Sequence, residues 1–275
     1  MNRKRALISD TFKVKKRRVF TEKFGATNNN DGPMDIKSTL LDLMTLFPRK
    51  IFNDTLPQIV LKHQLYSIHD DKTIVDRQLS ELREKGELLM FQLGFDSDAF
   101  GLVFTSDYKA KVLASQEGQD TKGTVERFLE SVLPACTDLS FNKDQMLKEF
   151  LFTDSAITQL VKSGVLTVRD AGSWWLAIPN SGKFTKYLIQ GRKAVLTMIK
   201  KSKYSEVLKE QLEERRTNAQ VKFQMKYHIH DIVGAELVQR TARMASSNTV
   251  LRPRWVRAEH SRYFTNPGKG NTGQM

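Results

Sequence analysis

The order of hydrophobic and polar positions between residues 35 and 106 predicts three helices followed by a β-hairpin. Apolar residues recur at helical spacing from Ile36 to Phe47, and a later apolar stripe begins after Asp71 and ends at Gly86. The expected elements are helices over 36–47, 53–63 and 72–85 and strands over 88–93 and 100–104. Three helices followed by a hairpin are the winged-helix arrangement, which is an α+β fold.

The same order of elements recurs between residues 107 and 180, although the residues themselves are not repeated. The expected elements are helices over 124–133, 142–150 and 153–163 and strands over 165–168 and 174–178. Solenoids repeat units of about 20–50 residues, so a period of roughly 70 residues favours tandem domains. In the last strand Trp174 and Trp175 are adjacent, so we expect one ring in the core and the other near the surface.

Residues 181–240 form a third group, which we expect to be a less complete winged helix. The expected elements are helices over 184–199, 204–216 and 230–240 and a strand over 221–227. No hairpin is expected afterwards, and residues 241–275, which are rich in Arg, Ser and Gly, are expected to be a flexible tail. Residues 1–34 are polar and basic and end in turn formers, so a disordered tail is expected there too.

The sequence therefore predicts an α+β fold of three tandem winged-helix domains with a disordered basic N-terminal tail. The expected domain ranges are 35–106, 107–180 and 181–240.

The positive charge of the chain is concentrated at its two ends. The 275 residues carry a formal net charge of +13. Basic and acidic side chains number nine and three over residues 1–34, 16 and 21 over 35–180, ten and four over 181–216, and nine and three over 217–275. Basic residues segregated in this way are typical of a surface that binds polyanions.

The helix expected over 184–199 combines an apolar stripe with a row of lysines. Lys186, Lys193 and Lys200 are spaced so that they fall within about 40° of one another around the helix. No acidic residue occurs between positions 181 and 203, whereas exposed helix faces usually mix charges of both signs. A lysine row suits the phosphates of a duplex, because each neutralised phosphate releases counterions. The candidate DNA-binding residues are Lys183, Lys186, Arg192, Lys193, Lys200, Lys201, Lys203, Arg215 and Arg216.

The other two expected domains lack an obvious base-reading helix. Their third helices carry acidic or nearly neutral side chains, while base readout needs residues such as Arg, Asn or Gln in the major groove. We therefore expect these domains to dock proteins. For the basic helix we expect phosphate contacts to double-stranded DNA without sequence specificity, with the preference between DNA and RNA left open.

Two basic clusters in the first 34 residues resemble a bipartite nuclear import signal. The first cluster is the triplet at positions 3–5. The second cluster comprises Lys13, Lys15, Lys16, Arg17 and Arg18. We therefore expect the protein in the nucleus, and a solvated polar tail without a targeting role is the alternative.

Several kinds of site and location are not expected. No run of about 18 apolar residues predicts a membrane span, and the first ten residues lack the apolar segment of a secretory signal. The single cysteine, Cys136, cannot form an internal disulfide, which favours a reducing compartment. The five histidines are scattered without metal-ligand spacing, so we expect no metal and no cofactor. His228 and His230 are expected to be packing or capping residues.

The motifs of a protein kinase are absent from the sequence. A kinase needs a glycine-rich phosphate loop, a strand lysine, a His-Arg-Asp catalytic loop and a metal-binding Asp-Phe-Gly. Residues 168–172 faintly echo two of these motifs but fall in an expected hairpin turn. No P-loop and no nucleophile elbow occur either, so no enzymatic activity is expected.

Seven segments resemble the serine/threonine-protein kinase 19 family, also called the winged-helix repair factor family. They are Phe47–Arg49, Leu56–Leu61, Asp76–Leu79, Gln92–Asp96, Ser131–Cys136, Gly164–Ala177 and Tyr227–Asp231. The resemblance implies a nuclear protein of three winged helices that binds DNA and RNA. It also implies that the DNA-binding basic positions of the family correspond here to Lys186, Lys200, Lys203 and Arg215.

The same resemblance implies a role in transcription-coupled nucleotide excision repair on chromatin. The protein would bridge stalled RNA polymerase II, the Cockayne-syndrome ubiquitin-ligase complex, TFIIH and downstream DNA. A homodimer stays open, because winged helices often pair through strands or helices. Two alternative functions are a protein kinase, which the family name suggests but the missing motifs disfavour, and an adaptor whose basic helix binds an acidic protein surface.

Overall fold

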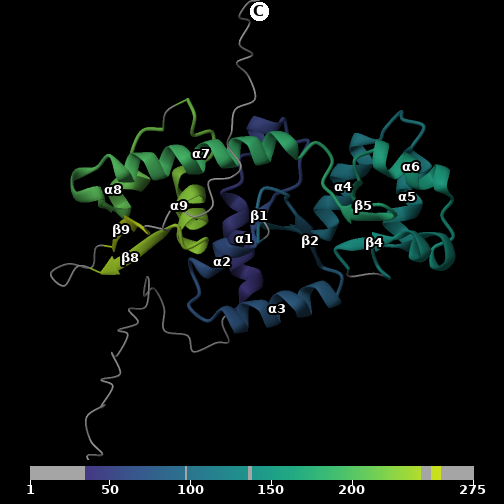
Figure 1. Cartoon of the computed structure of the whole chain (residues 1–275), viewed down its shortest axis with the longest axis horizontal. Coiled ribbons are helices and arrows are strands. Elements are labelled where there is room, and N and C mark those ends of the chain that lie inside the picture. Colours follow the sequence, from purple (N-terminus) through teal and green to yellow (C-terminus); the bar gives the residue numbers. More distant parts are fainter. Residues whose placement is uncertain (1–34, 97, 136–137, 218, 243–248, 255–275) are drawn as a thin grey trace, which may run out of the picture. The chain divides into compact units, whose positions relative to one another are not determined.

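The computed structural model describes residues 35–96, 98–135, 138–217, 219–242 and 249–254 (Figure 1). Within them, helices alternate with three antiparallel sheets of three strands each. The predicted N-terminal tail lies outside the described residues, and so do the expected import residues Lys13, Lys15, Lys16, Arg17 and Arg18.

The first sheet has the strand order β1-β3-β2. Its elements are α1 (Ile36–Thr45), β1 (Val60–Leu61), α2 (Lys62–Tyr66), α3 (Lys72–Glu84), β2 (Leu88–Gln92) and β3 (Phe100–Phe104). Helices α1 and α3 begin where the sequence predicts, because the Asp35 and Asp71 carboxylates accept hydrogen bonds from amides of the first turn. The predicted hairpin is also confirmed, as β2 and β3 pair over five residues.

The helix predicted over 53–63 is wrong. Arg49–Phe52 forms a single 3-10 turn instead, and it is followed by Asn53 and Asp54 with φ values of 50° and 56°. Left-handed backbone at two successive residues stops helix growth, although Asn and Asp tolerate it better than most side chains. Strand β1 and the short helix α2 then occupy the end of the predicted range.

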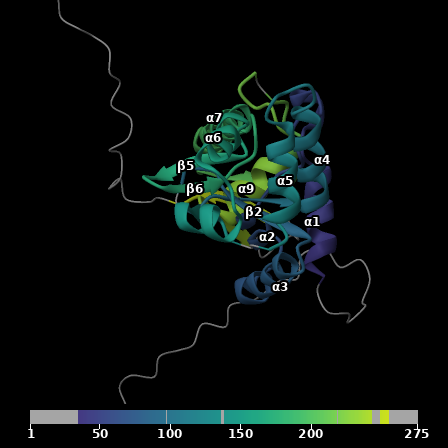
Figure 2. The same ribbon diagram turned by 90° about the vertical axis from the view of Figure 1, so that its right-hand side faces the viewer.

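The second sheet has the strand order β4-β6-β5. Its elements are α4 (Thr105–Ser115), α5 (Lys122–Ser131), β4 (Ser140–Asn142), α6 (Asp154–Lys162), β5 (Leu166–Asp170) and β6 (Ser173–Leu176). Helix α4, which the apolar pattern does not predict, packs against β3 and against α5, which lies beside it in Figure 2. The helix predicted over 142–150 is a single π-helical turn, Gln145–Glu149, that follows β4. Trp174 packs against the core, whereas the ring of Trp175 lies 4.5 Å from the Arg169 guanidinium.

The third sheet has the strand order β7-β9-β8. Its elements are α7 (Gly182–Lys200), β7 (Val207–Leu208), α8 (Lys209–Glu213), α9 (Met225–Gly234), β8 (Val238–Ala242) and β9 (Thr249–Pro253). A hairpin therefore follows the helices here too, and the expectation of none is wrong. The flexible tail predicted from residue 241 is wrong over 241–242 and 249–254, because β9 pairs with both neighbours and buries Leu251. Residues 243–248 of that expected tail lie outside the described residues. Residues 255–275 lie outside the described residues.

Three further predictions in this third group are wrong. No strand covers 221–227, although buried and exposed residues do alternate there, because an extended loop leads into the first turn of α9. The helix predicted over 204–216 is a 3-10 turn, Lys203–Ser205, followed by β7 and α8. The helix predicted over 230–240 is α9, which starts five residues earlier and ends at Gly234.

The described chain is a mixed α+β fold of helices and small antiparallel sheets, consistent with the winged-helix prediction. Aromatic rings from separate groups of elements share one core. The ring of Phe52 lies 6.3 Å from that of Phe184 on α7 and 6.1 Å from that of Phe223, which precedes α9. The C-terminal half of α7 instead packs in a second core with Leu251 of β9. Helix α7 is therefore held along its whole length by two apolar clusters.

Candidate nucleic-acid interface

Helix α7 separates an apolar face from a basic face. Phe184, Leu188, Val195 and Ile199 are buried, and they recur at the spacing of one helix stripe. The exposed basic residues of the helix are Lys183, Lys186, Lys193 and Lys200. At 1.5 Å per residue, the lysine row from position 186 to position 200 extends over about 21 Å. The helix therefore presents a row of ammonium groups long enough to follow several phosphates of a duplex.

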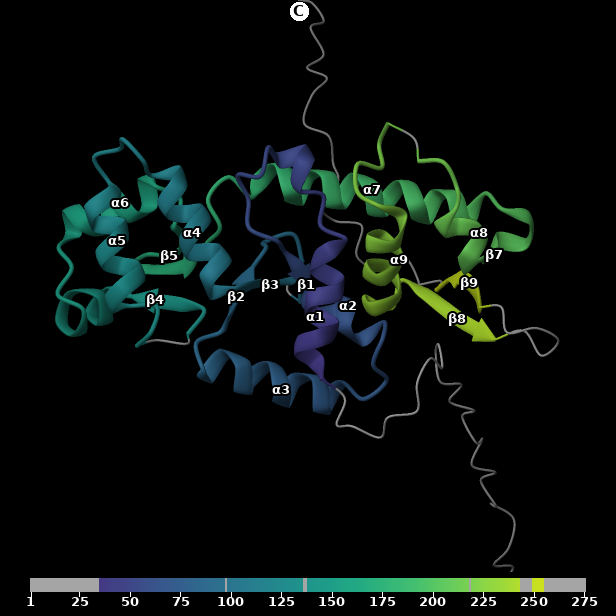
Figure 3. The same cartoon turned by 180° about the vertical axis from the view of Figure 1, so that it is seen from behind.

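Four other predicted residues are exposed beyond the end of α7: Lys201, Lys203, Arg215 and Arg216. The two arginines follow α8, which lies beside the C-terminal end of α7 in opposite views (Figures 1 and 3). Within the described part of the chain, no ion pair joins these four residues or the four exposed lysines of α7 to an acidic side chain. We call these eight residues the basic surface.

Arg192 lies apart from the basic surface, although it was predicted with the others. Its guanidinium donates two hydrogen bonds to Asp231 of α9, of 2.8 Å from Nε and 2.6 Å from Nη2. Its side chain is only 15% exposed, and it lies 5.2 Å from the ring of Phe95. Helical periodicity indicates that Arg192 faces away from the lysine row, because Arg192 is four residues after buried Leu188 and about 120° away from Lys186.

Asp231 joins three helices through one buried carboxylate. Besides the Arg192 pair, its Oδ1 lies 2.7 Å from Nε2 of His63 on α2, and the Asp231 side chain is fully buried. Burial alone raises the pKa of Asp231, but Arg192 and the His63 hydrogen bond outweigh it and hold the pKa well below its usual range. Helix α9 lies between α2 and α7 (Figure 3), so this network positions the lysine-bearing helix. Asp231, the central residue of the network, is not among the residues predicted from the sequence, where its only signal is a carboxylate at the end of a segment that resembles the family.

His228 and His230, two histidines of α9, are packed in the structure as uncharged side chains. His228 is fully buried, its ring stacks on Phe223 at 5.5 Å, and neither ring nitrogen has a hydrogen-bond partner among the described residues. Burial lowers the pKa of His228 from 6.5 to about 4. Burial also lowers the pKa of His230 to about 4, with smaller effects of nearby cations, while its Nδ1 lies 2.7 Å from Oγ of Ser67. The structure agrees with a packing role for both.

Acidification from pH 7 to pH 5 is expected to lower the free energy of unfolding by about 2 kcal/mol through His228 alone. The folded pKa near 4 lies below the unfolded value of 6.5, so the unfolded chain binds more protons between these pH values. The contribution of His228 to the free energy of unfolding is therefore complete above pH 6.5 and is lost as the pH falls towards 4. The pKa of His230 is lowered too, so His230 acts in the same direction. Urea unfolding at both pH values measures it, and a His228→Asn variant should show a weaker pH dependence. Equal stability of the unchanged protein at pH 7 and pH 5 would contradict this assignment.

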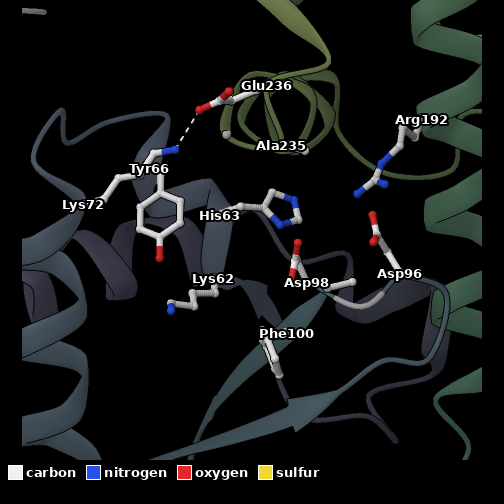
Figure 4. Close-up of a pocket in the computed structure, with 12 residues that line it drawn as sticks. Lys62, His63, Tyr66, Lys72, Asp96, Asp98, Phe100, Arg192, Ala235 and Glu236 are labelled. Carbon is white, nitrogen blue, oxygen red and sulfur yellow. Dashed lines mark hydrogen bonds and ion pairs between the residues drawn. The ribbon is translucent and has the colours of Figure 1, made fainter. Parts of the chain in front are cut away.

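A cavity of about 390 Å³ opens beside this network (Figure 4). On one side the Lys72 ammonium pairs with Glu236 at 2.7 Å. On the other side Figure 4 shows the Arg192 guanidinium facing the Asp96 carboxylate. Basic and acidic side chains line it in similar number, so it lacks the single-sign charge of the basic surface.

Other kinds of site receive no support from the described residues. No three His, Cys, Asp or Glu side chains among them gather closely enough to hold a metal ion. No helix in this part of the chain is both long and apolar enough to cross a membrane.

Comparisons with known proteins agree with the resemblance seen in the sequence. The model of a family described as inactive serine-threonine protein kinase 19 matches residues 48–242. Winged helix repair factor 1 of Homo sapiens is 50% identical over 249 residues, which cover 90% of this chain and 96% of that protein. The proteins of the same name from Mus musculus and Xenopus laevis are 48% and 46% identical, covering 92% and 86% of this chain and 98% and 94% of those proteins. The chain therefore belongs to the inactive serine-threonine protein kinase 19 family.

Proposed function

We propose that this protein is a non-enzymatic scaffold of DNA repair that binds nucleic acid through the basic surface. The names of its relatives, which are repair factors with winged helices, support the repair role. The three sheets, each preceded by helices, support a division into three tandem winged-helix domains. The description of the family as inactive and the missing kinase motifs support a role without catalysis.

The observation that carries the proposal is the row of exposed lysines on α7. Exposed lysines on a helix are ordinarily balanced by acidic residues one turn away, as in the pair Lys122–Glu126 on α5. The lysines of α7 have no such pairs with described residues, so their charges are available to phosphates. Phosphate contacts do not depend on base sequence, and we therefore propose binding without sequence preference.

Changing Lys186, Lys193 and Lys200 together to Glu is expected to weaken duplex binding about 100-fold at low salt. Three attractive contacts with phosphates become repulsive, while the buried face of α7 is unchanged. Fluorescence anisotropy of a labelled duplex of arbitrary sequence, titrated at two salt concentrations, measures the effect. The unchanged protein should lose affinity steeply as salt rises, and a second duplex of unrelated sequence should bind equally well.

The matched control is a second triple variant, in which three exposed lysines outside α7 are changed to Glu so that the net charge changes equally. Lys85, Lys122 and Lys148 are exposed on other elements, and their joint change to Glu should leave binding nearly intact. Equal losses in the two triple variants would attribute binding to net charge and not to α7. Full affinity of the α7 variant, or binding insensitive to salt, would reject the proposal and favour an adaptor whose basic helix binds an acidic protein surface.

We extend the proposal to transcription-coupled nucleotide excision repair in the nucleus. The expected partners are RNA polymerase II, the Cockayne-syndrome ubiquitin-ligase complex and TFIIH, and RNA is a second nucleic-acid ligand. The family resemblance is the support for these partners, while the segregated charge supports the nucleic-acid ligands.

A further inference from the structure

The turn that follows α7 holds the most exposed of the large apolar side chains in the described chain. Tyr204 is 80% exposed, compared with 69% for Leu151 and 65% for Val168. Among the described residues, its ring has a charged neighbour in Lys203, whose Nζ lies 5.2 Å from the ring centroid. An exposed aromatic ring of this size contributes nothing to the cores described above, so its position calls for another explanation.

The backbone presents this ring in an uncommon conformation. Tyr204 and Ser205 have φ values of 61° and 53°, which two adjacent residues other than glycine rarely adopt. Local hydrogen bonds hold the turn: the Ser205 amide donates to the carbonyl of Ser202 at 2.9 Å, and its hydroxyl donates to the carbonyl of Lys200 at 3.2 Å. The turn is thus ordered by its own bonds, and the ring projects from a defined backbone.

The surroundings of the ring are cationic. Lys200, Lys201 and Lys203 are all exposed within four residues of it and belong to the basic surface. The nearest acidic residue in the sequence, Glu206, forms an ion pair with Arg252 of β9. An aromatic face beside several ammonium groups is the combination that binds single-stranded nucleic acid, because the cations track the phosphates while the ring stacks on a base.

We propose that Tyr204 is a stacking site for an unpaired base next to a duplex held on α7. The inference rests on the proposed function and names its substrate class: nucleic acid with a junction between paired and unpaired strands. The lysine row contacts the phosphates of the duplex, and the ring at its C-terminal end receives the first base that lacks a partner strand. Stacking does not depend on base identity, so the site recognises the junction and not a sequence.

The test compares a blunt duplex with the same duplex carrying a short single-stranded extension. The extension contains 2-aminopurine, whose fluorescence is quenched when it stacks on an aromatic ring. For the unchanged protein and for Tyr204→Phe, the extension should tighten binding about tenfold and the fluorescence should fall. For Tyr204→Ala, both substrates should bind with the affinity of the blunt duplex, and the fluorescence should stay high.

Leu151→Ala is the matched control, because Leu151 is also exposed and also has a positive φ, of 55°. It should behave as the unchanged protein does, and equal melting temperatures of all variants would show that folding is unaffected. If Tyr204→Ala keeps the tenfold gain, or if the extension gives no gain in the unchanged protein, Tyr204 is not a stacking site. The blunt duplex reports on the proposed function separately: if it binds and the extension adds nothing, only the inference fails, and if it does not bind, the proposed function fails as well.

Discussion

Gly234→Ala is expected to lower the free energy of unfolding by about 3 kcal/mol or more. A Cβ at this position would lie 1.7 Å from the carbonyl oxygen and 2.5 Å from the carbonyl carbon of His63. These are backbone atoms of α2, so no side-chain rotation can relieve the overlap, and α2 and α9 would have to separate. Urea unfolding followed by circular dichroism measures the loss.

Gly123→Ala provides the matched control for this substitution. Gly123 also lies in a helix, α5, but a Cβ there would have no neighbour within 4 Å among the described residues. Alanine should be neutral or slightly stabilising at that position, since it reduces the freedom of the unfolded chain. A Gly234→Ala variant as stable as the Gly123→Ala variant would show that α2 and α9 do not approach as closely as the structure has them.

Asp231→Ala is expected to lower the free energy of unfolding by about 3–5 kcal/mol. The substitution leaves the Arg192 guanidinium, which is 15% exposed, without the carboxylate that compensates its burial. His63 loses its partner at the same time. Chemical denaturation at neutral pH measures the effect, and the loss should exceed that of substituting any exposed ion pair, such as Arg77–Glu81.

A double substitution separates the buried charge from simple loss of contact. Adding Arg192→Met to Asp231→Ala removes the uncompensated cation, so the double variant should recover part of the lost stability. If the double variant is less stable than Asp231→Ala by the full cost of Arg192→Met alone, the two residues are not coupled. Because Arg192 lies on the lysine-bearing helix, Asp231→Ala should also weaken duplex binding, though less than the lysine substitutions do.

The sequence by itself determined the elements whose signals are local. Helices α1 and α3 begin directly after Asp35 and Asp71, where the expected apolar stripes start, and the β2–β3 and β5–β6 hairpins lie where short apolar runs flank turn formers. The lysine row could also be predicted, because the apolar stripe and the charges lie on one helix with a known period. Each of these features depends on residues within a few turns of one another.

Only the tertiary structure decided features that depend on distant partners. The β8–β9 hairpin is held by pairing of β9 with β7 and by burial of Leu251, and neither appears in a local pattern. The alternation over 221–227 was real, but a period of two in burial does not by itself require a paired strand.

The same reason explains why the candidate site was predicted only in part. Arg192 and Lys193 are adjacent cations in the sequence, yet one is bound to a buried carboxylate and the other faces solvent. The need for glycine at position 234 arises only because α2 packs against it. Tyr204 is exposed in a turn after α7 whose left-handed backbone has no signal in the apolar pattern. Burial and electrostatic environment are set by neighbours that the fold brings together, whereas helical period and turn chemistry are properties of the local chain.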